Sequence, residues 1–164
     1  MKIVSAHITL AQIKAMNYLQ EIGLHPSVTE LMRMAVRSVL YVPIGMPDPE
    51  VNAGLDVSTF FKHVPKAIVV ALWNENLRDD KCQLHSLNFP VMILGWLDMI
   101  ATAQQTTRSD IIRVALHDYL QRELIMVELM SRKAVNVVFK KISTTRKAND
   151  IDMRRVKRMP RDKA

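Results

Sequence analysis

The sequence of 164 residues is long enough for one compact domain or two very small ones. Aromatic residues make up only 5% of it and methionine occurs 11 times, so we expect a core of aliphatic and thioether side chains. The single cysteine, Cys82, excludes an internal disulfide and the metal motifs that need two cysteines.

The net charge of +7 is distributed unevenly along the chain. Residues 131–164 contain 12 Lys and Arg against 3 Asp and Glu, a balance of +9, whereas residues 1–130 contain 11 against 13, a balance of −2. Such a basic segment indicates a polyanionic partner, nucleic acid above all, and a solvated tail that only aids solubility is the alternative. Residues 134–143 predict a short strand or a helix extension, and we expect the last twenty residues to be poorly ordered.

The sequence shows neither a signal peptide nor a membrane segment. The N-terminus lacks the charged segment, apolar run and small-residue cleavage site of a signal peptide. The longest apolar stretch, VMILGWLDMIA, contains Asp98 and has about half the length that a bilayer span needs. We therefore expect an intracellular protein that does not contact a membrane.

The first 40 residues predict a strand followed by two helices. Apolar and polar residues alternate over residues 5–10, which is typical of a half-exposed strand. The helix that follows ends near Gly23, and its apolar face consists of Ile13, Met16, Leu19 and Ile22. A second helix has Ser27 or Thr29 as its N-cap. Its apolar face consists of Val28, Leu31, Met32, Ala35, Val36 and Val39.

The middle of the chain predicts a connector and one helix. Residues 41–54 hold three prolines and two glycines, which is typical of a connector. A helix is predicted to begin near Pro65, because proline is tolerated in the first turn. Residues 67–73 are apolar on all sides and should be buried, either within this chain or in an oligomer. A fully buried strand is the competing assignment for them.

The opening pattern returns from Cys82 onward. Apolar and polar residues alternate again over residues 85–89, and two helical patterns follow. The first of these has an apolar stripe of Ile93, Trp96, Leu97, Ile100 and Ala103. The second has Thr107 or Ser109 as its N-cap. It is predicted to bury Ile111, Ile112, Ala115, Leu116, Tyr119 and Leu120.

The two halves form an internal repeat of strand, helix and helix. Shifted by 80 residues, Thr29–Arg33 aligns with Ser109–Arg113, and the strands align at a shift of 79. One such unit cannot bury its apolar faces or pair its strand, so we expect the two strands to pair antiparallel under four helices. A ribbon of two strands fits the major groove of B-DNA.

The second-helix motifs, SVTELMRMA from Ser27 and TRSDIIRVA from Thr107, resemble the ribbon-helix-helix class of DNA-binding regulators, which includes the Arc and methionine repressors. Both copies in one chain resemble the tandem ribbon-helix-helix regulators of archaeal viruses. The resemblance covers residues 1–40 and 82–124, just over half of the chain. It implies a mainly α fold with one short two-stranded antiparallel ribbon, in which tandem units form an intramolecular pseudo-dimer.

The resemblance also implies the residues that contact double-stranded DNA. On the outward strand positions, which face base edges in that family, lie Ser5, His7, Thr9, Leu84, Ser86 and Asn88. The phosphate-clamp positions at the second helices are Ser27, Thr29, Thr107, Arg108 and Ser109. Arg33 and Arg113 lie one turn further in, where we expect them to pair with acidic neighbours.

The chain also departs from the family pattern. Neither strand has Arg or Lys at an outward position near its centre, so strong guanine readout is not indicated. The second copy has AQQTT where the first has a glycine between its helices. Because residues 1–130 are nearly neutral, we expect the basic segment or self-association to supply much of the attraction to phosphate.

The sequence therefore predicts a transcription regulator that prefers certain DNA sequences and associates with itself along DNA. The predicted units are residues 1–40, a connector with a helix over 41–81, residues 82–130, and a basic extension over 131–164. No catalytic signature, cofactor motif, metal spacing or small-molecule site is indicated, so we do not expect an enzyme. If the chain is viral, it acts in the host cytoplasm. The alternatives are a DNA-coating protein, an antitoxin-like protein whose C-terminal segment binds a protein, and an interaction module without DNA binding.

Overall fold

The computed structural model describes residues 1–41, 57–78 and 80–156, and only the backbone of residues 41, 57, 58 and 137–156. In chain order the elements are β1 (Lys2–Thr9), α1 (Leu10–Glu21), α2 (Val28–Tyr41), α3 (Val57–Phe60), α4 (Lys66–Trp73), β2 (Cys82–Phe89), α5 (Val91–Ala103) and α6 (Arg108–Val156). The described chain is mainly helical with one two-stranded antiparallel sheet, as predicted, and this arrangement is ribbon-helix-helix-like. Most of the predicted connector, residues 42–54, lies outside the described residues.

The N-terminal strand pairs with the strand that the repeat predicted as its partner. Ser5 lies opposite Ser86 near the middle of the ribbon, and the register continues evenly to both ends. One face of the ribbon is buried against the helices, and the other is exposed. The buried apolar side chains of the ribbon are Val4, Ala6, Ile8, Leu87 and Phe89.

The core lies between the inner face of the ribbon and helices α1, α2, α5 and α6. Helix α6 packs against both α2 and β1, so the two second helices of the repeat meet under the ribbon. All six apolar residues predicted to be buried in the last helix, from Ile111 to Leu120, are buried. In α2, Leu31, Met32, Ala35 and Val36 are buried, which confirms most of the predicted face.

Thr9 is the one outward strand prediction that is wrong. Its side chain is fully buried because it caps α1 rather than facing outward from the ribbon. The Thr9 hydroxyl accepts from the Gln12 amide at 3.2 Å, and the Gln12 side chain accepts from the Thr9 amide at 3.3 Å. Gln12 also donates to the Arg113 carbonyl at 2.8 Å, which ties this cap to α6. Leu10, predicted as the last strand residue, begins the helix instead.

Replacing Thr9 by Ala is expected to lower the free energy of unfolding by about 1–2 kcal/mol, since a buried N-cap bond is lost. Thr9→Ser keeps the hydroxyl and removes only a methyl group, so it should retain most of the stability. Urea denaturation of the two variants separates these outcomes. Equal losses in both would mean that packing of the methyl group, not the cap, stabilises this turn.

Helix α4 confirms the predicted helix after Pro65, and the strand assignment for residues 67–73 is wrong. Val69 and Leu72 are buried, and the helix packs on α1 and α6. Val70 remains 46% exposed, so α4 is buried on one side only. This helix therefore covers part of the first unit from within the same chain.

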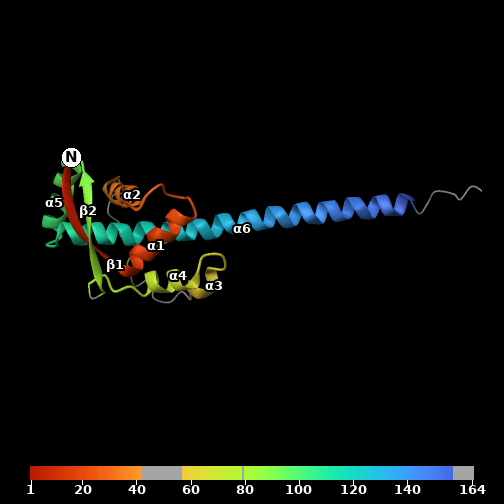
Figure 1. Cartoon of the computed structure of the whole chain (residues 1–164), viewed down its shortest axis with the longest axis horizontal. Helices are drawn as coiled ribbons and strands as arrows, with labels where there is room; N and C mark the ends of the chain where they lie inside the picture. The colour runs from red at the N-terminus through yellow and green to blue at the C-terminus, as the bar shows by residue number, and fades with distance from the viewer. Residues whose placement is uncertain (42–56, 79, 157–164) are drawn as a thin grey trace, which may run out of the picture.

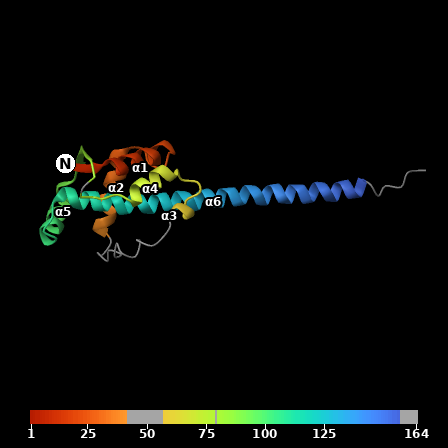
Figure 2. The same cartoon turned by 90° about the horizontal axis from the view of Figure 1, so that it is seen from below.

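Helix α6 begins beside the ribbon and continues well beyond the other elements (Figures 1 and 2). It has 49 residues, so at about 1.5 Å per residue it is about 70 Å long. Residues 134–143 are thus a helix extension and not a strand. The prediction that the last twenty residues are poorly ordered is wrong for 145–156, which are helical, while 157–164 lie outside the described residues. None of the described helices combines the length and apolar character that crossing a membrane requires.

Candidate nucleic-acid interface

The exposed face of the ribbon carries three cross-strand pairs of short side chains: Ile3 with Asn88, Ser5 with Ser86, and His7 with Leu84. All six are exposed. Five of them are outward positions predicted from the sequence, and the sixth is Ile3, at the opposite end of β1 from Thr9. Val4 continues the inward phase of Ala6 and Ile8, but Ile3 is apolar at an outward position, so the alternation gave no signal for it. The strand therefore begins and ends earlier than predicted.

The chemistry of this face suits base edges more than phosphates. The Asn88 amide can donate and accept, as pairing with adenine requires, and the serine hydroxyls can do either. Ile3 and Leu84, which are 73% and 63% exposed, offer apolar contacts of the kind that a thymine methyl group makes. No Lys, Arg, Asp or Glu lies among these six residues, so the face has little electrostatic attraction of its own.

Each edge of the ribbon is held by one of the second helices. On the β1 edge, the His7 amide donates to the Ser109 hydroxyl of α6 at 2.9 Å. On the β2 edge, the Arg33 guanidinium of α2 donates to the Asn88 carbonyl at 3.2 Å. These bonds satisfy backbone groups that a two-stranded ribbon leaves unpaired, and they place the start of α6 beside His7.

The predicted phosphate residues at α2 lie at its exposed N-terminus. Ser27 is the N-cap, and its hydroxyl accepts from the Glu30 amide at 3.2 Å. Thr29 is exposed in the first turn. Glu30 and Arg33 form an ion pair at 3.2 Å, which confirms the expected acidic partner of Arg33. This helix end can present a hydroxyl and amides to an anion.

The start of α6 already holds a carboxylate of this chain. Thr107 is the N-cap, accepting from the Asp110 amide at 3.1 Å and donating to the Asp110 carboxylate at 2.6 Å. The hydrogen bond from Thr107, with further ones from Thr106 and Arg113, lowers the pKa of Asp110 to about 2, against the opposing effect of burial. The ion pair with Asp110 confirms the expected acidic partner of Arg113. An anion at this end would meet the charge of Asp110.

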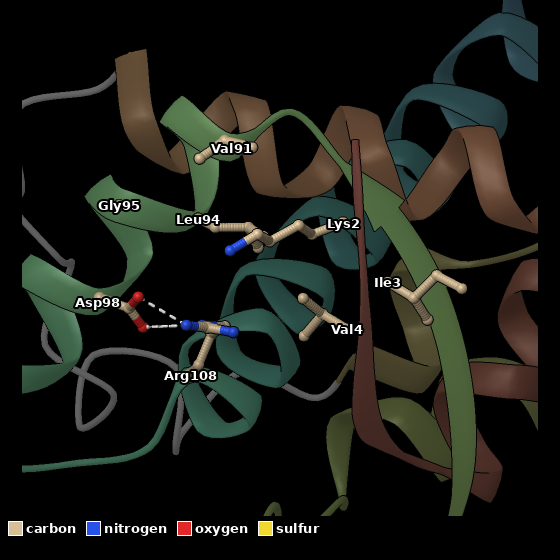
Figure 3. Close-up of a pocket in the computed structure, with 8 residues that line it drawn as sticks. All are labelled: Lys2, Ile3, Val4, Val91, Leu94, Gly95, Asp98 and Arg108. Carbon is tan, nitrogen blue, oxygen red and sulfur yellow. Dashed lines mark hydrogen bonds and ion pairs between the residues drawn. The ribbon is translucent and has the colours of Figure 1, made fainter.

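Arg108 is held against α5 by Asp98. Its guanidinium nitrogens lie 2.5–2.8 Å from the two carboxylate oxygens. Figure 3 shows this ion pair in a pocket of about 290 Å³, which Lys2 and Gly95 also line. In this arrangement Asp98 takes the Nε and Nη2 donors of Arg108, so Arg108 cannot bind a phosphate through that edge.

Replacing Asp98 by Asn is expected to free Arg108 and tighten DNA binding about threefold, with a steeper salt dependence. Asp118→Asn is the matched control, because it removes the same charge from an ion pair with Arg122 further along α6. Titrations at two salt concentrations measure the difference between the variants. If both strengthen binding equally, only the net charge matters and Arg108 does not contact phosphate.

The basic C-terminal segment does not reach the ribbon within the described chain. Along α6, residues 140–155 lie about 45 to 70 Å beyond Ser109, on the part of the helix that leads away from the ribbon (Figure 1). Six Lys and Arg occur between those positions. These basic residues therefore lie on a part of the helix that is separate from the exposed ribbon face.

In the described part of the chain, no three His, Cys, Asp or Glu side chains gather closely enough to hold a metal ion. Comparisons of the chain with protein-family models, curated proteins and solved structures gave no match. The function must therefore be argued from the geometry of the ribbon and its flanking helices.

Proposed function

We propose that this chain is a double-stranded DNA-binding regulator with a sequence preference. In this proposal the units β1–α1–α2 and β2–α5–α6 form an intramolecular pseudo-dimer that inserts its ribbon in the major groove. The observation that carries the proposal is the exposed ribbon face, where six side chains, none of them Lys, Arg, Asp or Glu, lie in three cross-strand pairs. A ribbon of two strands, about 5 Å between strands, enters a groove about 12 Å wide.

The flanking helices support the same role. Ser109 and Arg33 bind opposite edges of the ribbon, so the starts of α6 and α2 are tied to its two sides. A duplex whose groove holds the ribbon would bring its two phosphate backbones to these helix ends. The Ser27 hydroxyl and the first-turn amides of α2, together with Arg108 once it leaves Asp98, would then position the protein, while the ribbon selects the sequence.

The long α6 favours a second candidate, an antitoxin-like protein that binds DNA and also a protein partner. From Lys133 to Asn136 the side chains are exposed, and the helix continues to Val156 away from the other described elements. A helix of this length without packing partners gains little stability by itself and is suited to binding another chain.

The test is binding of the full chain to duplexes selected from a random pool, followed by footprinting of the best site. We expect protection over a short site that survives an excess of random duplex at physiological salt. Binding that random duplex abolishes would favour the DNA-coating alternative. Absence of DNA binding, with capture of a defined partner on α6, would favour a protein-interaction module.

A further inference from the structure

The outer face of α5 carries four exposed large apolar side chains, with the exposed polar residues Asp98 and Thr102 beside them. Its exposed large side chains are Val91, Met92, Trp96 and Met99, with exposed fractions of 57%, 64%, 36% and 64%. The opposite face is also apolar and is buried in the core through Ile93, Leu94, Leu97 and Ala101. A surface helix normally presents polar residues to solvent, whereas these fractions show that no described element covers four large apolar side chains of α5.

The corresponding helix of the first unit differs in both composition and cover. Outward from α1 point polar residues such as Lys14, Asn17 and Gln20, which are exposed. Helix α4 packs against α1, and its Val69 and Leu72 are buried. The first unit therefore has an apolar helix of its own chain as cover, whereas the second unit does not.

We propose that a second copy of this chain covers the outer face of α5, with α5 packed against α5 about a two-fold axis near Gly95. Gly95 lies in the middle of the face, and a Cβ built there would meet nothing within 4 Å, so two helices can approach closely at this point. A two-fold contact uses the same face on both copies, so the apolar side chains of one copy would meet those of the other.

The chemistry of the exposed side chains favours an apolar partner. Asp98 pairs with Arg108 beside this face, and Lys2 lines the same pocket. Val91, Met92, Trp96 and Met99 themselves offer no group that pairs with a charge, whereas an equally apolar helix can cover them without burying an unpaired charge.

This geometry predicts closed pairs rather than filaments. In the described chain the outward residues of α1 are polar, so an α5–α5 contact about a two-fold axis joins two copies and leaves no second α5 face for a third. The four side chains bury on the order of 400 Å² per copy, about half of the ~800 Å² typical of a stable partner. Pairing of two copies should therefore be weak in free solution and stronger where DNA holds the copies side by side. The second expectation rests on the proposed function.

The first test is sedimentation velocity of the full chain, without DNA, from micromolar to near-millimolar concentration. We expect a monomer–dimer equilibrium, which Met99→Glu weakens by about tenfold or more because it would bury a charge. The control, Val70→Glu, makes the same kind of change at an exposed apolar residue of α4 and should leave the equilibrium unchanged. A chain that stays monomeric, a series of species larger than dimers, or equal effects of the two variants would overturn the proposal.

The second test uses a disulfide between copies. In a Cys82→Ser background, Gly95→Cys should cross-link two chains under mild oxidation, because the axis brings the two positions together. Val70→Cys should not. No Gly95→Cys cross-link would contradict the α5 pairing. DNA titrations of the same variants separate the two proposals. If the chain binds DNA but does not pair, only the α5 pairing is overturned. If it pairs but does not bind DNA, only the proposed function as a DNA-binding regulator is overturned.

Discussion

Replacing Glu128 by Gln is expected to lower the free energy of unfolding by about 3 kcal/mol at neutral pH. Glu128 lies on α6 and is fully buried. Its carboxylate accepts from the backbone amides of Lys62, His63 and Val64 at 2.9, 2.7 and 3.1 Å, and from Arg132 at 2.9 Å. This one side chain therefore fastens the segment between α3 and α4 to α6.

The effect has a defined pH dependence. Burial alone would raise the pKa of Glu128, but the three amides and Arg132 outweigh it and lower the pKa from 4.5 to about 2. Because the folded protein holds the carboxylate charged, the contribution is complete above about pH 4.5 and is lost as the pH falls towards 2. The unfolding free energy of the wild type should fall across this window, and that of Glu128→Gln should fall less.

Urea denaturation at several pH values measures both effects. The matched control is Glu21→Gln at an exposed position of α1, where we expect a change within about 0.5 kcal/mol. Parallel pH profiles for the wild type and Glu128→Gln would show that the charge of Glu128 does not stabilise the fold. Faster amide exchange of Lys62, His63 and Val64 in the variant would localise the loss.

Replacing His7 and Asn88 together by Ala is expected to reduce the preference for the selected DNA site over random duplex by about 100-fold. Each good base contact contributes about 1–3 kcal/mol of discrimination, and these two side chains carry polar groups on opposite strands of the ribbon face. Both are exposed, so the thermal unfolding of the double variant should match the wild type. Competition binding at fixed salt measures the preference.

The matched control replaces Asn17 and Gln20, two exposed polar residues of α1, by Ala. It should leave the preference unchanged. If the ribbon variant also retains it, the ribbon does not read the sequence, and contacts by the basic segment of α6 become the explanation. Thr9 is left out of the variant, because its side chain caps α1 and is buried.

The elements that the sequence predicted well are those with a local cause. Alternation places side chains on opposite faces of a strand, and helical spacing gathers apolar residues on one face. Both patterns therefore predicted β1, β2, α2 and the first part of α6 from the local sequence alone. The repeat added the pairing of the strands, because neither unit can satisfy its strand alone. Five of the six outward ribbon positions followed from these patterns.

The remaining features depend on where distant segments meet in space. Thr9 fits the alternation, but the turn into α1 buries it. Asp98 forms its ion pair with Arg108 only because α5 packs against the start of α6. Glu128 accepts hydrogen bonds from residues 62–64 only because the segment between α3 and α4 packs on α6.

Helices α4 and α5 show most clearly what the sequence predicts and what depends on the tertiary structure. Composition marked residues 67–73 of α4 as a segment that needs cover, since they are apolar on all sides, and it gave α5 an apolar stripe. Composition cannot tell which of the two covers another helix of the same chain, because that depends on the path of the backbone. The tertiary structure packs α4 on α1 and leaves the outer face of α5 exposed.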